Sequence, residues 1–174
     1  MTRPTLPVRR AHAGDAAKLS MLGTATFLDS FAEDHPFDAI RAHMEANHSE
    51  AAYHAIFADP ANAVWILESP VGTPVGFAML TPPSADVPLR PGDIELKRIY
   101  ILPGWKGGGH GRALMDAAMA EARARGAVRM LLSVYEKNPA AQAFYGRLGF
   151  RRIGEQCFMV GPVPFVDHVM ALDL

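Results

Sequence analysis

The sequence has 174 residues, of which 49% are hydrophobic and 20% charged. This composition is typical of a soluble globular protein, and the length predicts a single domain over residues 1–174 with a sizeable core. The formal net charge is −1 at pH 7, so the chain offers no broad attraction for nucleic acid or for an anionic membrane. It also shows no signal-peptide core, no membrane-spanning run and a single cysteine, Cys157. These features favour a cytoplasmic protein without a disulfide.

The first half of the chain reads as a short strand, a group of helices and a hairpin. In order, the pattern predicts a strand at 8–11, a helix that follows Asp15 and runs to about Ser30, helices at 40–48 and 51–58, and strands at 63–67 and 75–80. A turn rich in Pro and Gly joins the last two strands. The proline-rich stretch from Thr81 to Asp93 is long for a connection, and we expect it to shape a site.

The second half alternates strands and helices. Ile94–Leu102 is the expected central strand, and its apolar end from Ile99 to Leu102 is typical of a strand covered on both faces. A helix closing at Gly126 and a strand at 130–135 follow, and this strand-helix-strand order implies parallel pairing. Two further strands are expected at 152–160 and 166–172. The fold class is therefore α/β (α+β): a mixed, strongly twisted sheet of about six to seven strands with helices on both faces.

A glycine-dense loop separates the central strand from the helix that follows it. Gly107, Gly108, Gly109 and Gly111 lack a Cβ atom, so they can adopt positive φ and let backbone N–H groups approach a ligand. The following helix directs its unpaired N–H groups and positive dipole end at the loop. This arrangement predicts a phosphate or pyrophosphate site. The alternative is a flexible glycine turn that opens an ordinary helix.

Two common phosphate motifs do not fit this loop. A nucleoside-triphosphate loop needs Lys and Ser or Thr where the chain has His110 and Gly111. A dinucleotide loop needs a third glycine where the chain has Arg112 or Leu114, depending on the starting glycine. The ligand is therefore expected to be a different phosphate compound.

A second motif starts at Asn138. Asn138 can cap a helix whose first residue is Pro139, and an apolar face at helical spacing follows it. Gly149 can end this helix in the left-handed conformation. The helix therefore carries Tyr145 at a defined place on its apolar face.

Together these two motifs resemble the Gcn5-related N-acetyltransferase (GNAT) superfamily. The stretch from Lys106 to Gly111 is similar to the family's basic-x-x-Gly-x-Gly signature, with Lys where the family more often has Gln or Arg. The stretch from Asn138 to Phe150 is similar to its Asn-x-x-Ala-x-x-Phe-Tyr-x-x-x-Gly-Phe segment. The resemblance is specific over Ile94–Phe150 and implies a splayed central pair of parallel strands that admits acetyl-CoA.

The resemblance also implies roles for individual residues. The backbone N–H of Ile101 would bond the thioester carbonyl, and Ile99 would contact pantetheine through its main chain. The cofactor site would comprise Ile99, Tyr100, Ile101, Lys106, Gly107, Gly108, Gly109, His110, Gly111, Arg112, Asn138 and Ala141. No metal is expected, because His35, His48, His54 and His110 do not form a convincing ligand set.

Two side chains are candidates for proton transfer. Tyr145 would protonate the departing CoA thiolate; since a thiol has a pKa of about 8.5 and a phenol one of about 10, the benefit would come from position in a dry site. The alternative is a core tyrosine with a satisfied hydroxyl. Glu95 is the candidate base, because without a bulge it would share the face of Ile99 and Ile101. The alternative is a carboxylate paired with Lys97 or Arg98.

The acceptor is expected to be a primary amine of a small molecule, attacked directly in a ternary complex. The stretches 26–37 and 96–101 look most like the bacterial spermidine/spermine acetyltransferase-like branch, and Glu33, Asp34 or Asp86 would attract a cationic amine. A protein N-terminal acetyltransferase and a non-catalytic acyl-CoA sensor are the alternatives. The sequence leaves open whether the chain forms a homodimer.

Overall fold

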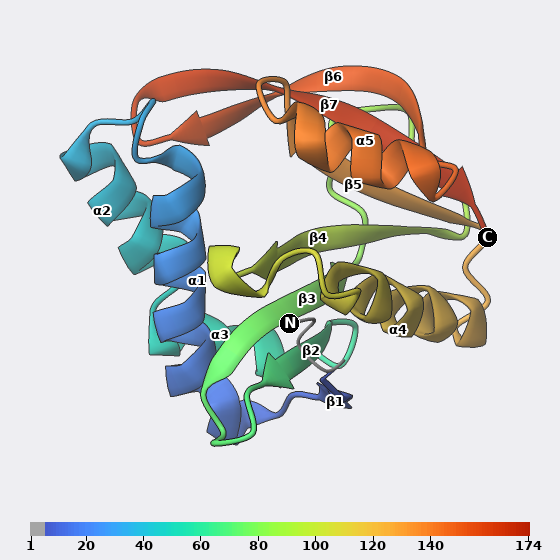
Figure 1. Cartoon of the computed structure of the whole chain (residues 1–174). Helices are drawn as coiled ribbons and strands as arrows, with labels where there is room; N and C mark the ends of the chain where they lie inside the picture. Colours follow the sequence, from blue (N-terminus) through green and yellow to red (C-terminus); the bar gives the residue numbers. More distant parts are fainter. Residues whose placement is uncertain (1–5) are drawn as a thin grey trace.

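A seven-stranded sheet with helices on both faces makes up the computed structural model, which describes residues 6–174 (Figure 1). Residues 1–5, which belong to the expected single domain, lie outside the described residues. The elements follow in the order β1 (Val8–Arg10), the 3-10 turn η1 (Ala13–Asp15), α1 (Ala16–Phe31), α2 (Phe37–Asn47), α3 (Glu50–Ala58), β2 (Ala63–Glu68), β3 (Pro74–Thr81), β4 (Asp93–Ile101), the 3-10 turn η2 (Pro103–Trp105), α4 (His110–Ala124), β5 (Arg129–Tyr135), α5 (Pro139–Arg147), β6 (Arg151–Val160) and β7 (Val163–Asp173).

The strands lie in the order β1-β2-β3-β4-β5-β7-β6, and only β4 and β5 are parallel. This pair is short, since it runs from Asp93 opposite Arg129 to Leu96 opposite Leu132. Beyond that point β5 stays paired with β7 as far as Tyr135, while β4 stays paired with β3. The two strands therefore separate, which confirms the expected mixed sheet with a splayed central pair.

The two faces of the sheet are covered by different helices. On one face, α4 packs its fully buried Leu114, Met115, Ala118 and Ala122 against β2, β3 and β4, and α5 joins the same core. On the other face, α1 and α3 pack Leu19, Leu22 and Tyr53 against β2 and β3. Each buried Leu contributes about 1.5–3 kcal/mol. Both cores thus hold β4 in place from either side.

A bulge at Lys97 interrupts β4. Met79 of β3 lies opposite Arg98, whereas the next residue, Leu80, lies opposite Leu96. The extra residue Lys97 changes which face the later side chains occupy. Ile99 and Ile101 pack with the α4 core, as do Ile94 and Leu96.

Two expectations about strand ends need correction. The run from Ile99 to Leu102 is half-buried and not covered on both faces, because β5 has diverged from it; Leu102 itself lies outside β4. The last strand begins at Val163 and not at 166, and Val160 lies opposite Val163 in a tight hairpin. Pro164 has no backbone N–H to donate to a neighbouring strand. It is tolerated there because β7 at that point pairs only with β6, so one side of the strand needs no hydrogen bonds. Across residues 6–174, none of the helices combines the length and apolar character needed to cross a membrane.

Candidate active site

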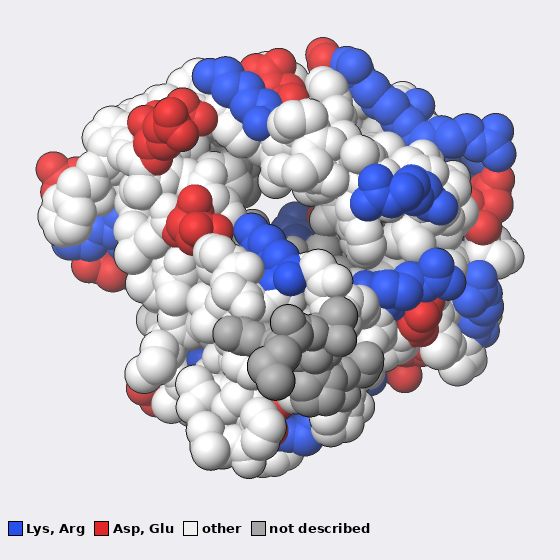
Figure 2. All heavy atoms as spheres, in the orientation of Figure 1, with Lys and Arg blue, Asp and Glu red and all other residues white. Residues whose placement is uncertain are grey.

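The separation of β4 and β5 leaves a gap at the centre of the sheet. Figure 2 shows the surface hollowed in this region, with charged side chains visible in its depth. The N–H of Leu102 donates to the carbonyl of Val75 on β3 at 2.9 Å. Since successive N–H groups of a strand point to opposite sides, the N–H of Ile101 points toward the gap. A polar ligand lying between the strands could therefore accept a hydrogen bond from β4.

The glycine loop lies between β4 and α4. Gly107 and Gly109 have φ values of 84° and 80°, and a Cβ atom on either would have no heavy atom within 4 Å. Gly109 is also the N-cap of the 15-residue helix α4, and no side chain caps its first N–H groups. This open end, with its positive dipole, is a suitable cradle for an anion.

His110 holds the loop in shape. It is 1% exposed, and its Nδ1 donates to the carbonyl of Trp105 at 2.9 Å, while its Nε2 is buried without a partner. A Cβ atom on Gly108 would lie 2.8 Å from the His110 ring. Gly108 is thus required by space, whereas Gly107 and Gly109 are required by their positive φ. At Gly111, φ is not positive and a Cβ atom would make only ordinary contacts.

Two basic residues flank the loop, and each has an acidic neighbour. Lys106 Nζ lies 3.5 Å from Asp29 of α1. Arg112 Nε donates to Asp116 one helical turn further along α4, at 2.8 Å. Both pairs are exposed to solvent, so they contribute little to stability. Lys106 and Arg112 remain free to turn toward a phosphate.

Helix α5 brings Tyr145 to the α4 face of the sheet. Its start is as expected, since Asn138 Oδ1 accepts from the N–H of Ala141 at 3.1 Å and Pro139 is the first helical residue. Tyr145 is 8% exposed and packs edge-on against the ring of Phe150. Its hydroxyl bonds to no other group among residues 6–174. Burial, together with the charge of Tyr100, raises the pKa of Tyr145 well above its usual value. The phenol therefore stays protonated across the physiological range.

Glu95 lies in a different environment from the one expected. The bulge at Lys97 removes the face-sharing argument, because Glu95 lies between Ile94 and Leu96 and so points away from the α4 core. It is 1% exposed, and its carboxylate accepts from Ser84 N at 2.6 Å, from Ser84 Oγ at 2.9 Å and from Lys97 Nζ at 3.1 Å. Ser84 belongs to the long connection 81–93, which here supports Glu95. The role of Glu95 as a base stays a prediction.

The expected acidic residues separate into two places. Asp34, in the turn after α1, accepts a hydrogen bond from the Tyr135 hydroxyl at the end of β5, at 3.1 Å. Glu33 is exposed beside it. Asp86 lies in the connection after β3, where its N–H donates to Gln156 of β6 at 3.0 Å. The structure thus places Asp34 and Glu33 near the open end of β5.

The sequence reading missed two charged groups on the Glu95 side of the sheet. Asp167 of β7 is 9% exposed, and burial raises its pKa to about 6, which the charge of Lys97 partly opposes. Arg98 lies over the Tyr53 ring at 5.8 Å, and its Nη1 is buried without a partner. A signal for Asp167 was present, because an acid inside the apolar run Phe165-Val166-Asp167-His168-Val169 is unusual.

Comparison with known proteins gives a consistent picture. The sequence model of the acetyltransferase (GNAT) family matches residues 25–150. An uncharacterized N-acetyltransferase of Mycobacterium tuberculosis is 33% identical over 160 residues, which cover 92% of this chain and 98% of that protein.

Solved structures share the fold. The PaiA N-acetyltransferase of Thermoplasma acidophilum, solved in complex with coenzyme A, has a TM-score of 0.78 at 16% identity, covering 98% of this chain and 99% of that one. The spermidine/spermine N-acetyltransferase SpeG of Vibrio cholerae has a TM-score of 0.66 at 20% identity, covering 97% and 95%. At these identities the likeness shows the fold and leaves the acceptor open.

Proposed function

Because this chain belongs to the acetyltransferase (GNAT) family, we propose that it transfers the acetyl group of acetyl-CoA to a primary amine of a small molecule. The chain is an acetyl-CoA-dependent acetyltransferase; the acceptor and the direct attack in a ternary complex are the proposal. The proposal is supported by two features that lie next to each other. β4 and β5 part after Leu96, and the uncapped end of α4 opens beside the end of β4.

The residues present fit the donor. The loop from Lys106 to Gly111, with the first N–H groups of α4, would hold the pyrophosphate. Ile99 would contact pantetheine through its main chain, and the N–H of Ile101 would donate to the thioester oxygen as negative charge develops there. Tyr100, Arg112, Asn138 and Ala141 would complete the proposed cofactor site. Acetyl-CoA supplies the activated acyl group, and the protein supplies position and hydrogen bonds.

Tyr145 would act as the general acid. A neutral phenol in a dry site can donate its proton to the sulfur as the carbon–sulfur bond breaks. Support comes from its burial, its raised pKa and a hydroxyl that forms no hydrogen bond within residues 6–174. Glu95 remains the base predicted from the sequence. Because three hydrogen bonds already occupy its carboxylate, it would have to act through a relay.

Among small amines, a polyamine is the first acceptor to test. Glu33 and Asp34 offer carboxylates beside the open end of β5, and a cationic amine would be attracted to them. The competing acceptor is the free N-terminus of a peptide.

The test is acetyl-CoA-dependent thiol release, with mass detection of the product, across polyamines, amino acids, aminoglycosides and short peptides. A mass gain of one acetyl group on a small amine supports the proposal. Acetylation of peptides alone would favour the protein N-terminal acetyltransferase. Binding of CoA without turnover on any amine would contradict the proposed reaction and favour an acyl-CoA sensor.

A further inference from the structure

Asp167 is a buried carboxylate with no hydrogen-bond or ion-pair partner among residues 6–174. It lies in the middle of β7, and its side chain is 9% exposed. The carboxylate makes no hydrogen bond and no ion pair with any other residue of 6–174. An ionised group in such a place is costly unless something compensates its charge. The Asp167 carboxylate is therefore a proton acceptor that makes no hydrogen bond or ion pair stabilising the fold of residues 6–174.

The neighbours on β5 and β6 are engaged elsewhere. Tyr135 lies opposite Asp167 on β5, but its hydroxyl donates to Asp34. Gln156 lies opposite it on β6, but its amide bonds Ser133 Oγ at 2.9 Å and the N–H of Asp86 at 3.0 Å. Neither side chain is turned to the Asp167 carboxylate.

Two residues of β4, Lys97 and Tyr100, interact electrostatically with Asp167. The charge of Asp167 contributes to the raised pKa of Tyr100, and Tyr100 in turn acts on Tyr145. Lys97 is the nearby cation, but its Nζ is bonded to Glu95 and to Ser84 Oγ. Tyr100 therefore lies within electrostatic reach of both Asp167 and Tyr145.

The helical side adds no cation that would neutralise Asp167. His35 stacks on Phe165, two residues before Asp167, with ring centroids 3.7 Å apart. Burial lowers the pKa of His35, so this ring is neutral at pH 7. Asp34 beside it is a further acid, and Arg98 acts on the Tyr100 hydroxyl from β4 without bonding Asp167. Among residues 6–174 no cation is bonded to Asp167, so an ammonium group from a ligand could take that place.

We propose that Asp167 is the carboxylate that binds the ammonium group of the acceptor and takes its proton. This inference rests on the proposed function and names the acceptor as a cationic primary amine. A group on β7 is suited to the task because Asp167 lies opposite Tyr135, where β5 has parted from β4, and interacts with Tyr100, the neighbour of Ile101 in β4. Glu95, by contrast, is held by Ser84 and Lys97.

The ammonium gives one proton to the Asp167 carboxylate and becomes a neutral amine with a free electron pair. That pair forms the bond to the thioester carbon, and the carbon–sulfur bond breaks with its electrons on sulfur. Tyr145 gives its proton to the thiolate and regains one from the new amide nitrogen. Asp167 later releases its proton to water. The products are the acetamide, CoA thiol and one proton.

The test compares Asp167→Asn with Asp173→Asn, the same change at an exposed position of the same strand. We expect Asp167→Asn to lower kcat/KM about 100-fold for a strongly basic amine at pH 7, and the remaining activity to rise about tenfold per pH unit as free amine appears. With the weakly basic nucleophile hydroxylamine, which is already largely neutral, the loss should be under threefold. Asp173→Asn should match the wild type, and CoA affinity by calorimetry should be unchanged in both variants.

Equal losses with both nucleophiles, or an unchanged rate in Asp167→Asn, would overturn the inference. If Glu95→Gln alone shows the loss that depends on amine basicity, the base is Glu95. If Asp167→Asn fails to fold, Asp167→Glu takes its place and should keep the wild-type pH profile at a reduced kcat.

A second readout does not depend on turnover. The Asp167 carboxyl carbon, followed by NMR, should titrate near pH 6, and this titration should move to lower pH when the alkylammonium ion of the panel acceptor, or spermidine if no acceptor is found, is added. A titration near pH 4 that ignores the amine would overturn the inference. If the wild type acetylates no acceptor but the titration of Asp167 shifts with the amine as expected, the proposed reaction would be wrong. Asp167 would then still be a binding site for an ammonium group.

Discussion

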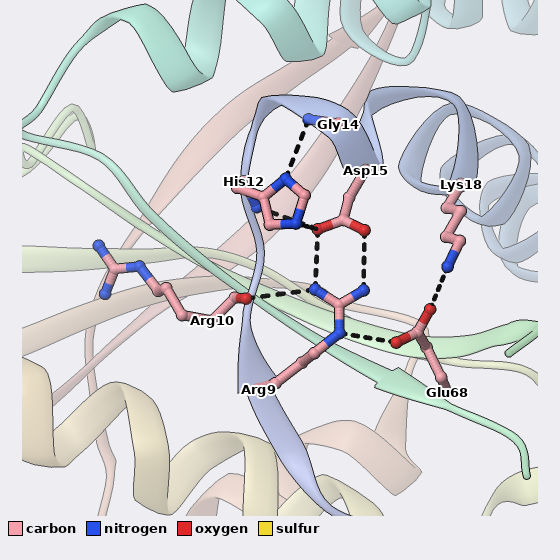
Figure 3. Close-up of polar contacts among 7 residues, drawn as sticks. All are labelled: Arg9, Arg10, His12, Gly14, Asp15, Lys18 and Glu68. Atoms are coloured by element: carbon pink, nitrogen blue, oxygen red, sulfur yellow. Dashed lines mark hydrogen bonds and ion pairs between the residues drawn. The ribbon is translucent and has the colours of Figure 1, made fainter.

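The ion-pair network at the start of α1 and the gap between β4 and β5 both contain buried carboxylates. The carboxylates of the network are paired with cations, whereas the one in the gap is not. In the network, Arg9 donates two hydrogen bonds of 2.8 Å to Asp15 and one of 2.7 Å to Glu68, and Lys18 also pairs with Glu68 (Figure 3). These contacts fasten β1 and β2 to α1. In the gap, Asp167 has no partner. The same chemical group therefore has a pKa of about 2 at Asp15 and about 6 at Asp167.

The difference shows where this protein uses charge for its fold and where it keeps charge available. Arg9 lowers the pKa of Asp15 through hydrogen bonds, so the ionised form stabilises the folded state. Burial raises the pKa of Asp167 because nothing replaces the water it has lost. Groups left in this condition tend to cluster at functional sites. The variants below separate the two regions, from the largest expected effect to the smallest.

Gly109→Glu should abolish the anion site while leaving the network intact. A side chain at φ 80° is strained, and its negative charge would repel the pyrophosphate at the end of α4. We expect CoA affinity to fall at least about 100-fold, roughly 3 kcal/mol, as measured by calorimetry. The matched control is Gly72→Glu, which has φ 81° and open space in the β2–β3 turn. It should lose similar stability and keep its CoA affinity; equal CoA affinity in both variants would refute the loop assignment.

Asp15→Asn should damage the network alone. The change leaves Arg9 without its main partner, and because Arg9 is 38% exposed the cost is expected to be about 2 kcal/mol, less than for a fully buried pair. Chemical denaturation measures this loss, and Asp38→Asn, at an exposed carboxylate, serves as the control. kcat/KM should stay within twofold of the wild type. A large loss of activity would mean that the network and the gap are coupled.

The two carboxylates should give pH dependences of opposite sign. Between about pH 2 and 4 the unfolded chain holds a proton at Asp15 that the folded state lacks, so the network stabilises the protein less as pH falls. Between about pH 4 and 6 the folded state holds a proton at Asp167 that the unfolded chain has lost, so stability falls as pH rises. Asp167→Asn should therefore be more stable than the wild type by about 2 kcal/mol at pH 7 and by much less at pH 4. Thermal unfolding at both values checks the sign, and a constant difference would contradict it.

Tyr145→Phe should give the smallest effect. The departing thiol is more acidic than a phenol, so an acid helps it only modestly, and we expect kcat to fall about tenfold. CoA affinity and stability should hardly change, because the hydroxyl has no partner in the described part of the chain. Tyr135→Phe is the contrasting variant, since it removes a hydroxyl that bonds Asp34 and should cost about 1 kcal/mol of stability. An unaltered kcat in Tyr145→Phe would remove the acid role.

Local chemistry explains what could be predicted from the sequence. The N-cap at Asn138, the glycines at 107 and 109 and the apolar face of α4 depend on residues a few positions apart, and the structure confirms each. The environment of Glu95 depends on Ser84, eleven residues away, and on the register with β3. That of Asp167 depends on the pairing of β7 with both β5 and β6. These pairings bring together distant parts of the chain, so local patterns do not reveal them.

The bulge at Lys97 makes β4 sensitive to length as well as to sequence. Before the bulge, the register of the strand points the Glu95 side chain at Ser84. After the bulge, the register points the N–H of Ile101 at the gap. Deleting one residue here would shift one half against the other, so that either Glu95 would lose Ser84 or Ile101 would turn its N–H toward β3. Lys97→Arg keeps both the count and a cation beside Glu95 and should be tolerated, whereas an insertion or deletion anywhere between Glu95 and Ile101 should not. The spacing of this segment, more than the identity of its residues, is what the reaction requires.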